Sequence, residues 1–231
     1  PSKSVLGIHL EGPFVSGGRR GALPVDGIHD WNEKLFDRLH DAADGQLRVM
    51  TFAPEEVPIS AQKKFNSVGV LGSIGHTCAD AQQTSAAIDA GIRRCTHLCN
   101  AMPPIHQRDP GPVMALLLDD RVRCEVILDG HHLDDEMVKM ALKMKGIGGL
   151  MAVSDAMPLA DMGVSSGVFC GQEVCSDGST VTLADGTLAG SVTLLPEALR
   201  RTGEMLGLGF PELSAIGAAN AAQDLGLPRR G

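Results

Sequence analysis

Residues 68–98, VGVLGSIGHTCADAQQTSAAIDAGIRRCTHL, hold two apolar runs separated by an amphipathic segment at 79–90. Each run is apolar on both faces, which is typical of a strand buried in a parallel sheet. The segment between them is typical of a helix that connects two such strands. His76 follows the first run and His97 lies near the end of the second. The stretch predicts a strand–helix–strand unit with ligand-type side chains at its strand ends.

The same alternation extends over most of the chain. Strands are predicted at 4–10, 47–52, 68–74, 92–98, 123–128 and 150–153. Helices are predicted at 32–43, 79–90, 112–118, 134–144, 194–206 and 212–222. Repeated strand–helix units predict an α/β fold, and about six of them correspond to an incomplete (β/α)8 TIM barrel.

The pattern changes after Asp155. Residues 163–190 are rich in Gly, Ser, Thr and Asp, which predicts turns and hairpins. We therefore expect a partial barrel over 1–162, a hairpin segment over 163–190, and C-terminal helices over 191–231 that complete the barrel domain. The first predicted strand starts close to a first residue that is not Met, so we also expect a front end to be lacking.

The composition of the chain disfavours some classes of binding partner. The net charge of −8 over 231 residues disfavours nucleic acid and anionic membranes, which attract basic surfaces. No apolar run reaches the roughly 20 residues of a membrane span, so neither a membrane span nor a signal peptide is expected. The six cysteines form no C-x-x-C pair, so reduced, mostly buried thiols in a cytoplasmic protein are expected. Cys95 and Cys99 flank His97, but no second cysteine pair completes a structural zinc site.

Ligand-type residues follow five of the six predicted strands, where β/α barrels gather their catalytic groups. They are His9, Glu11, His76, His97, Asp129, His131, His132 and Asp155. The second strand, which ends in Phe52-Ala53-Pro54, offers no strong candidate. His29, His40 and His106 are interpreted as solvated or structural.

Glu11, His76 and His97 together offer one carboxylate and two imidazoles, a set that suits one divalent metal ion. Zinc fits best, and iron, manganese and cobalt accept similar ligands. Asp155 could take a proton from water and pass it to a leaving amine. Each residue alone has an ordinary explanation, such as a turn cap at Glu11 or a helix N-cap at Asp155. Their joint placement at successive strand ends favours the metal site.

Seven motifs occur in a characteristic order: HLEGPF (9–14), GHT (75–77), THLCNAM (96–102), RDPG (108–111), DGHH (129–132), SDA (154–156) and GTLAGS (186–191). Together they resemble the N-acetylglucosamine-6-phosphate deacetylase family of the amidohydrolase superfamily, over the chain as far as Asn220. The resemblance implies a metal-centred barrel beside a small β-sandwich, of which only remnants are expected here, and a homodimer. It also implies hydrolysis of N-acetyl-D-glucosamine 6-phosphate to D-glucosamine 6-phosphate and acetate, in amino-sugar catabolism.

The resemblance further assigns roles to individual residues. It implies that Glu11, His76 and His97 bind the metal and that Asp155 is the catalytic acid and base. Positions that match substrate contacts are Asn100, Ala101, Arg108, His132, Leu188, Ala189, Gly190, Ala22 and Leu23. Arginine suits the phosphate because its guanidinium forks onto two oxygens.

Three departures keep alternatives open. Leu23 stands where the family usually has a substrate-contacting His, and Cys99 replaces a usual Phe. The family's first strands, with an early His-containing metal motif, have no counterpart. The chain is therefore expected to hold one metal and to be poorly active by itself. The alternatives are a related amidohydrolase acting on another N-acetylated sugar phosphate or a cyclic amide, a catalytically impaired fragment, and a non-catalytic metal-binding protein.

Overall fold

The computed structural model describes residues 5–227, which fall into two compact units. Within the described range, one unit is formed by residues 5–20, 25–96 and 101–122, and the other by residues 21–24, 97–100 and 123–227. The predicted strand at 4–10 begins at a residue that lies outside the described range. Within that range the strand starts only at Ile8.

Parallel strands form the main sheet. Within residues 5–227 six of them occur: β1 (Ile8–Glu11), β2 (Leu47–Phe52), β3 (Leu71–Ile74), β4 (Arg94–Cys95), β5 (Arg123–Ile127) and β6 (Leu150–Val153). They follow one another in the sheet in the order in which they occur in the chain. This order is the one that a β/α barrel requires. The prediction of six parallel strands is confirmed.

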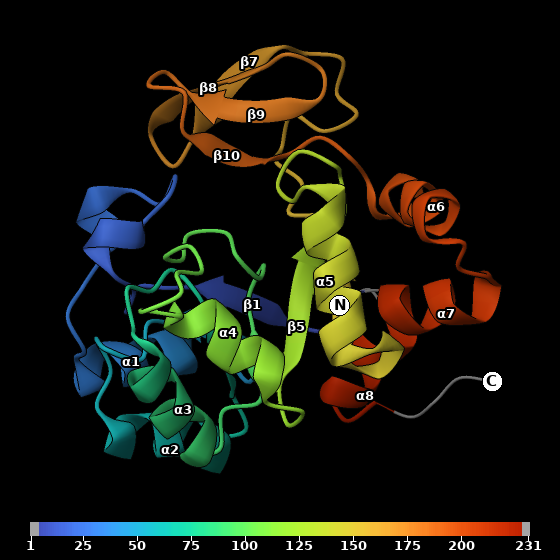
Figure 1. The fold of residues 1–231 in the computed structure, drawn as a ribbon. Helices are drawn as coiled ribbons and strands as arrows, with labels where there is room; N and C mark the ends of the chain where they lie inside the picture. Colours follow the sequence, from blue (N-terminus) through green and yellow to red (C-terminus); the bar gives the residue numbers. More distant parts are fainter. Residues whose placement is uncertain (1–4, 228–231) are drawn as a thin grey trace. The chain divides into compact units, whose positions relative to one another are not determined.

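Helices alternate with the strands of the first unit (Figure 1). They are α1 (Glu33–Ala42), α2 (Ile59–Ser67), α3 (Ala81–Asp89) and α4 (Gly111–Leu118). The side chain of Asn32 caps α1 by accepting a hydrogen bond from Leu35 N, and Asp80 forms a capping box with Gln83 at α3. Helix α2 was not predicted, because a buried Gln62 interrupts its apolar face.

An aromatic cluster fills the core of the first unit. Phe14, Trp31, Phe36, Phe52 and Phe65 have ring centroids 4.8 to 6.0 Å apart. The four phenylalanines are fully buried, and tilted or edge-to-face pairs such as these stabilise a core beyond their buried area. The cluster fixes the segment that follows β1 against α1, α2 and β2.

The second unit contains the remaining helices, α5 (Asp135–Lys145), α6 (Leu195–Leu206), α7 (Phe210–Ser214), a π-helical turn (Ala215–Ala219) and α8 (Asn220–Asp224). The predicted helix at 212–222 is thus interrupted by a π-helical turn. The buried amide of Asn220 donates to the carbonyl oxygens of Ile147 and Leu150, at 2.7 and 2.8 Å. It ties the C-terminal helices to the start of β6.

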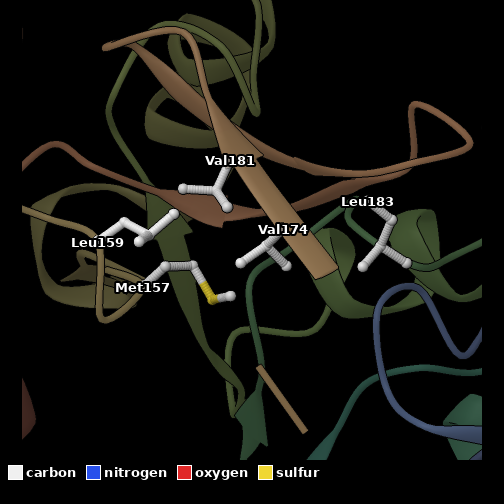
Figure 2. Close-up of a cluster of buried hydrophobic side chains, with 5 residues drawn as sticks. All are labelled: Met157, Leu159, Val174, Val181 and Leu183. Atoms are coloured by element: carbon white, nitrogen blue, oxygen red, sulfur yellow. The ribbon is translucent and has the colours of Figure 1, made fainter. Parts of the chain in front are cut away.

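A small antiparallel sheet occupies most of the predicted hairpin segment. Its strands are β7 (Ser166–Phe169), β8 (Gln172–Ser176), β9 (Thr180–Leu183) and β10 (Leu188–Ser191), in the order β10-β9-β8-β7 (Figure 1). Beneath it lies a cluster of buried side chains, Met157, Leu159, Val174, Val181 and Leu183 (Figure 2). The boundaries of the hairpin segment at residues 162 and 190 stay predictions. Strand β10 runs to Ser191, one residue beyond the second of them.

Short 3-10 turns complete the described secondary structure: η1 (Gly17–Arg19), η2 (Val25–Gly27) and η3 (Ile147–Gly149). No helix within residues 5–227 is long and apolar enough to cross a membrane.

All six cysteines are free thiols in the structure, and half of them are exposed, so the prediction of mostly buried thiols was wrong. The exposed ones are Cys78, Cys170 and Cys175, which lie in a loop, at a hairpin turn and on β8. Burial raises the pKa of the Cys99 thiol to about 12, and the nearby Cys124 adds to this effect. Cys99 therefore stays protonated near neutral pH, which disfavours it as a metal ligand.

Candidate metal centre

Glu11 and His76 face each other across the carboxyl ends of β1 and β3. Glu11 is the last residue of β1, and its Oε1 lies 3.0 Å from Nε2 of the buried His76. The other ring nitrogen, Nδ1, lies 2.8 Å from the carbonyl oxygen of Arg19. Because a carbonyl can only accept, Nδ1 carries a hydrogen, and Nε2 is the ring nitrogen that can bind an ion beside the carboxylate. Two electron-rich atoms so arranged favour a cation beside them.

His97 completes the predicted set. The ligand atoms of Glu11, His76 and His97 all lie within 4.8 Å of one another. One carboxylate oxygen and two imidazole nitrogens are ligands that zinc and related divalent ions accept. The donor set therefore fits a metal ion, and the Arg19 carbonyl supplies the kind of outer hydrogen bond that orients a metal-bound histidine.

Left-handed backbone conformations mark the residues that follow the strands. His76, His97, Ala101 and Asp155 have φ values of 48°, 30°, 50° and 48°. For residues other than glycine this region costs of order 1 kcal/mol or more, so the surroundings must hold it in place. The left-handed conformation of His97 prevents β4 from continuing, and the strand ends at Cys95. The prediction of a strand that continues to residue 98 was therefore wrong.

A chain of buried hydroxyl groups lies behind the strand ends. His9 Nε2 is 2.8 Å from Thr51 Oγ1, which is 2.8 Å from Thr96 Oγ1, which in turn is 2.7 Å from Ser73 Oγ. These contacts link β1, β2 and β3 to the residue that precedes His97. His9 thus belongs to this network and is not a member of the metal-ligand group.

Asp155 is anchored through its backbone to strand β10. Ser191 N donates to the Asp155 carbonyl oxygen at 2.9 Å, and Met157 N donates to the Ser191 carbonyl oxygen at 2.9 Å. Ala156 and Ser191 form a parallel bridge. Asp155 itself is an exposed residue whose main chain is fixed.

A second carboxylate holds the predicted sugar-contacting histidine. Asp129 Oδ2 lies 2.7 Å from His132 Nδ1, and Asp129 Oδ1 accepts hydrogen bonds from the backbone N–H groups of His131 and His132, both at 2.9 Å. Burial alone would raise the pKa of Asp129, but the hydrogen bonds from His132 and from these N–H groups lower it overall. Because the carboxylate accepts from Nδ1–H, Nε2 is the ring nitrogen of His132 that Asp129 does not engage.

The remaining predicted substrate contacts are scattered over several elements. Arg108 is exposed, and the Asn100 amide donates to the carbonyl oxygens of His97 and Leu98 in its own loop. Ala22 and Ala189 pack against the Met157 cluster, and Gln172 Nε2 donates to the Ala22 carbonyl oxygen at 2.8 Å. Leu23, Leu188, Ala101 and Gly190 are half-buried or buried. All of these stay predicted substrate contacts.

Glu55 is the polar residue near the strand ends that the sequence pattern missed. It lies beyond the end of β2, after Pro54, and its carboxylate bonds to the loop that follows His76. The signal was present as an acidic residue following the second strand, but the intervening Ala53-Pro54 made it look like part of a loop.

Comparisons with known proteins place the chain in a family. A scan against models of known families finds no match. The N-acetylglucosamine-6-phosphate deacetylase of Bacillus subtilis (strain 168) is 38% identical over 226 residues, which cover 96% of this chain and 57% of the relative. A mutant of the N-acetyl-D-glucosamine-6-phosphate deacetylase of Mycobacterium smegmatis, solved in complex with N-acetyl-D-glucosamine-6-phosphate, matches with a TM-score of 0.91. That match is 34% identical and covers 96% of this chain and 60% of the other.

The chain belongs to the N-acetylglucosamine-6-phosphate deacetylase family. It spans about three fifths of the length of these relatives. The predicted fold, an incomplete TIM barrel with remnants of a small β-sandwich, is confirmed by the neighbouring structures and by the strand order, and the second part is seen as one separate antiparallel sheet. This chain is also similar to an N-acetylgalactosamine-6-phosphate deacetylase of Escherichia coli O157:H7, with 33% identity over 98% of this chain and 60% of that relative.

Proposed function

We propose that the protein hydrolyses N-acetyl-D-glucosamine 6-phosphate to D-glucosamine 6-phosphate and acetate, as one step of amino-sugar catabolism. The observation that carries the proposal is the grouping of Glu11, His76 and His97 ligand atoms within 4.8 Å in a chain of this family. We further propose that the ion held there is zinc, that the protein is a cytoplasmic homodimer, and that it binds no nucleic acid.

The proposed reaction needs a nucleophile, a polarised carbonyl and a proton carrier. When bound, a divalent ion supplies the first two by lowering the pKa of water and withdrawing charge from the amide carbonyl. Asp155 takes the proton that the attacking water loses as its oxygen bonds to the acetyl carbon. It then passes this proton to the amine nitrogen as the C–N bond breaks, so that acetate and the free amino sugar leave.

The other residues bind and orient the substrate in this proposal. His132, whose ring is fixed by Asp129, presents Nε2 to the acetamide or to a sugar hydroxyl. Arg108 forks onto the 6-phosphate, and the Asn100 loop lies beside it along the chain. Residues 22, 23 and 188–190 line the sugar.

The proposal is tested with Asp155→Asn and a matched variant, Asp161→Asn. Both aspartates are exposed and both have positive φ, at 48° and 58°. Acetate release and zinc content are measured on each purified protein. We expect the Asp155 variant to keep its zinc and to lose at least about 10²-fold in kcat, the lower range for general acid–base catalysis. Equal turnover in all three proteins, or no acetate release by any of them, would count against the proposal.

The second candidate is hydrolysis of an epimeric substrate, N-acetyl-D-galactosamine 6-phosphate. It is favoured by the likeness to the Escherichia coli relative and by Leu23, which cannot hydrogen-bond a sugar hydroxyl. Comparing kcat/KM for the two epimers decides between them. A preference for the galacto epimer would replace the first candidate without affecting the metal centre.

A further inference from the structure

Glu55 binds the loop after His76 with both carboxylate oxygens. Oε2 accepts a hydrogen bond from the Thr77 hydroxyl and Oε1 accepts one from the Cys78 backbone N–H, each at 2.5 Å. Thr77 is fully buried and Glu55 is half-buried. Hydrogen bonds to an ionised acceptor are roughly twice as strong as those between neutral groups, so this pair constrains the loop strongly.

The loop needs such a constraint because His76 has a left-handed backbone conformation, with φ 48°. Other bonds converge on the same residues. Ser16 N donates to the His76 carbonyl oxygen at 2.9 Å, and Thr77 N donates to the Ala101 carbonyl oxygen at 3.2 Å. The Thr77 hydroxyl also accepts from Ala79 N at 2.8 Å. Glu55 contributes the charged acceptor of this set and engages the two residues directly after the histidine.

We propose that Glu55 is a positioning residue for the metal ligand His76. By fixing Thr77 and Cys78 it holds the His76 backbone in the conformation that directs Nε2 toward Glu11, 3.0 Å away. The inference rests on the proposed metal centre. It gives the segment after β2 a role at that centre, although the sequence offered no strong candidate there. The Glu55 carboxylate bonds to the loop that follows the ligand His76, and Glu55 is not itself a member of the ligand group.

The test compares Glu55→Gln with Glu56→Gln. Glutamine matches the shape of glutamate but replaces one carboxylate oxygen with an NH2 group, so in the same position a donor would face Thr77 or Cys78 in place of an acceptor. Glu56 is the adjacent half-buried carboxylate, and it is not among the groups that bond residues 76–79 in the described part of the chain. Cobalt(II) titration is the readout, because its visible absorption reports both affinity and ligand geometry.

We expect Glu55→Gln to lower the cobalt affinity about 10-fold, the lower end for lost outer-shell support, and to change the visible spectrum at saturating cobalt. Glu56→Gln should match the wild type in both. A purely structural role for Glu55 would lower stability and leave the saturated spectrum unchanged, which would overturn the inference. Wild-type protein that binds no cobalt would overturn the metal centre itself, and the inference with it.

A second pair of variants keeps the test decisive if Glu55→Gln does not fold. Thr77→Ser retains the hydroxyl that Glu55 accepts from, whereas Thr77→Val removes it at nearly constant volume. Wild-type affinity in the serine variant together with weakened cobalt binding in the valine variant supports the proposal. Equal cobalt affinity and spectra in the two variants contradict it.

Discussion

Gly190 lies so close to Asp155 that a side chain at position 190 would collide with the aspartate's main chain. A Cβ on Gly190 would stand 2.8 Å from the Asp155 carbonyl oxygen and 2.6 Å from Met157 Cγ. The φ of Gly190 is +153°, a conformation that other residues rarely adopt. Strand β10 can approach the proposed acid–base residue only because this position is glycine.

We therefore expect Gly190→Ala to destabilise the protein by about 1–3 kcal/mol, the usual range for forced overpacking. Because the strain falls on the Asp155 backbone, kcat should fall more than KM rises. Gly186→Ala in the same hairpin is the control, since its φ is +85° but no atom lies within 4 Å of the added Cβ. Urea denaturation and steady-state kinetics on both variants check this. Equal effects at the two positions would show that backbone conformation, and not the close approach, matters.

Metal binding should stabilise the fold. Zinc at 100 times its dissociation constant is expected to raise the free energy of unfolding by about 2.7 kcal/mol, provided that the unfolded chain does not bind it. Glu11→Gln should abolish most of this gain by removing the carboxylate ligand. Glu173→Gln, at an exposed glutamate on β8, should retain it. Denaturation with and without zinc measures both. If zinc raises the free energy of unfolding of the Glu11 variant as much as that of the wild type, Glu11 is not a ligand.

The lowered pKa of Asp129 predicts a pH dependence of stability. A carboxyl group whose folded pKa lies below its unfolded value stabilises the protein above the unfolded value, near 4. This contribution is lost as the pH falls from about 4 toward the folded pKa. Asp129→Asn should therefore be less stable than the wild type at pH 7, with a difference that shrinks in acid.

Denaturation midpoints of Asp129→Asn and Asp161→Asn between pH 7 and 3 provide the measurement. Asp161 is exposed and takes no part in the hydrogen bonds that Asp129 makes with His131 and His132, so its variant should run parallel to the wild type. A stability difference for Asp129→Asn that stays constant with pH would mean that its loss acts through packing alone.

Arg108 should govern recognition of the phosphate. Arg108→Met removes the guanidinium and is expected to raise KM for the 6-phosphorylated substrate by roughly 10–150-fold, the equivalent of about 1.5–3 kcal/mol for a hydrogen bond to a charged group. Turnover of unphosphorylated N-acetyl-D-glucosamine should barely change. Arg38→Met, at an exposed arginine on α1, is the control. A similar loss for both substrates would assign Arg108 a structural role.

The strands were predictable where burial on both faces leaves a continuous apolar run. The bounds of β2 and β6 were predicted without error, and those of β5 to within one residue. The prediction for β4 failed because His97 leaves the ladder in a left-handed conformation, which an apolar pattern does not record. Helix α2 was missed because Gln62 is buried, where its amide donates to the Val57 carbonyl oxygen at 2.8 Å.

The candidate site was predictable where the chemistry lies in the residue type. The grouping of Glu11, His76 and His97 followed from donors at successive strand ends. Glu55 was missed because its role depends on which loop its carboxylate reaches, and this is a property of the packing of α/β units rather than of spacing. The contacts of Asp155 with Ser191 are likewise long-range and leave no periodic trace.

The backbone hydrogen bonds between Asp155 and β10 affect the order in which the protein would lose its structure on heating. The sheet β7–β10 rests on a cluster of five buried side chains, a small core that can open before the rest of the protein does. Its opening would release Asp155, the proposed proton carrier, while Glu11 and His76 stay in place on β1 and after β3. Warmed protein would then lose the proposed activity at a temperature where it still binds a metal ion.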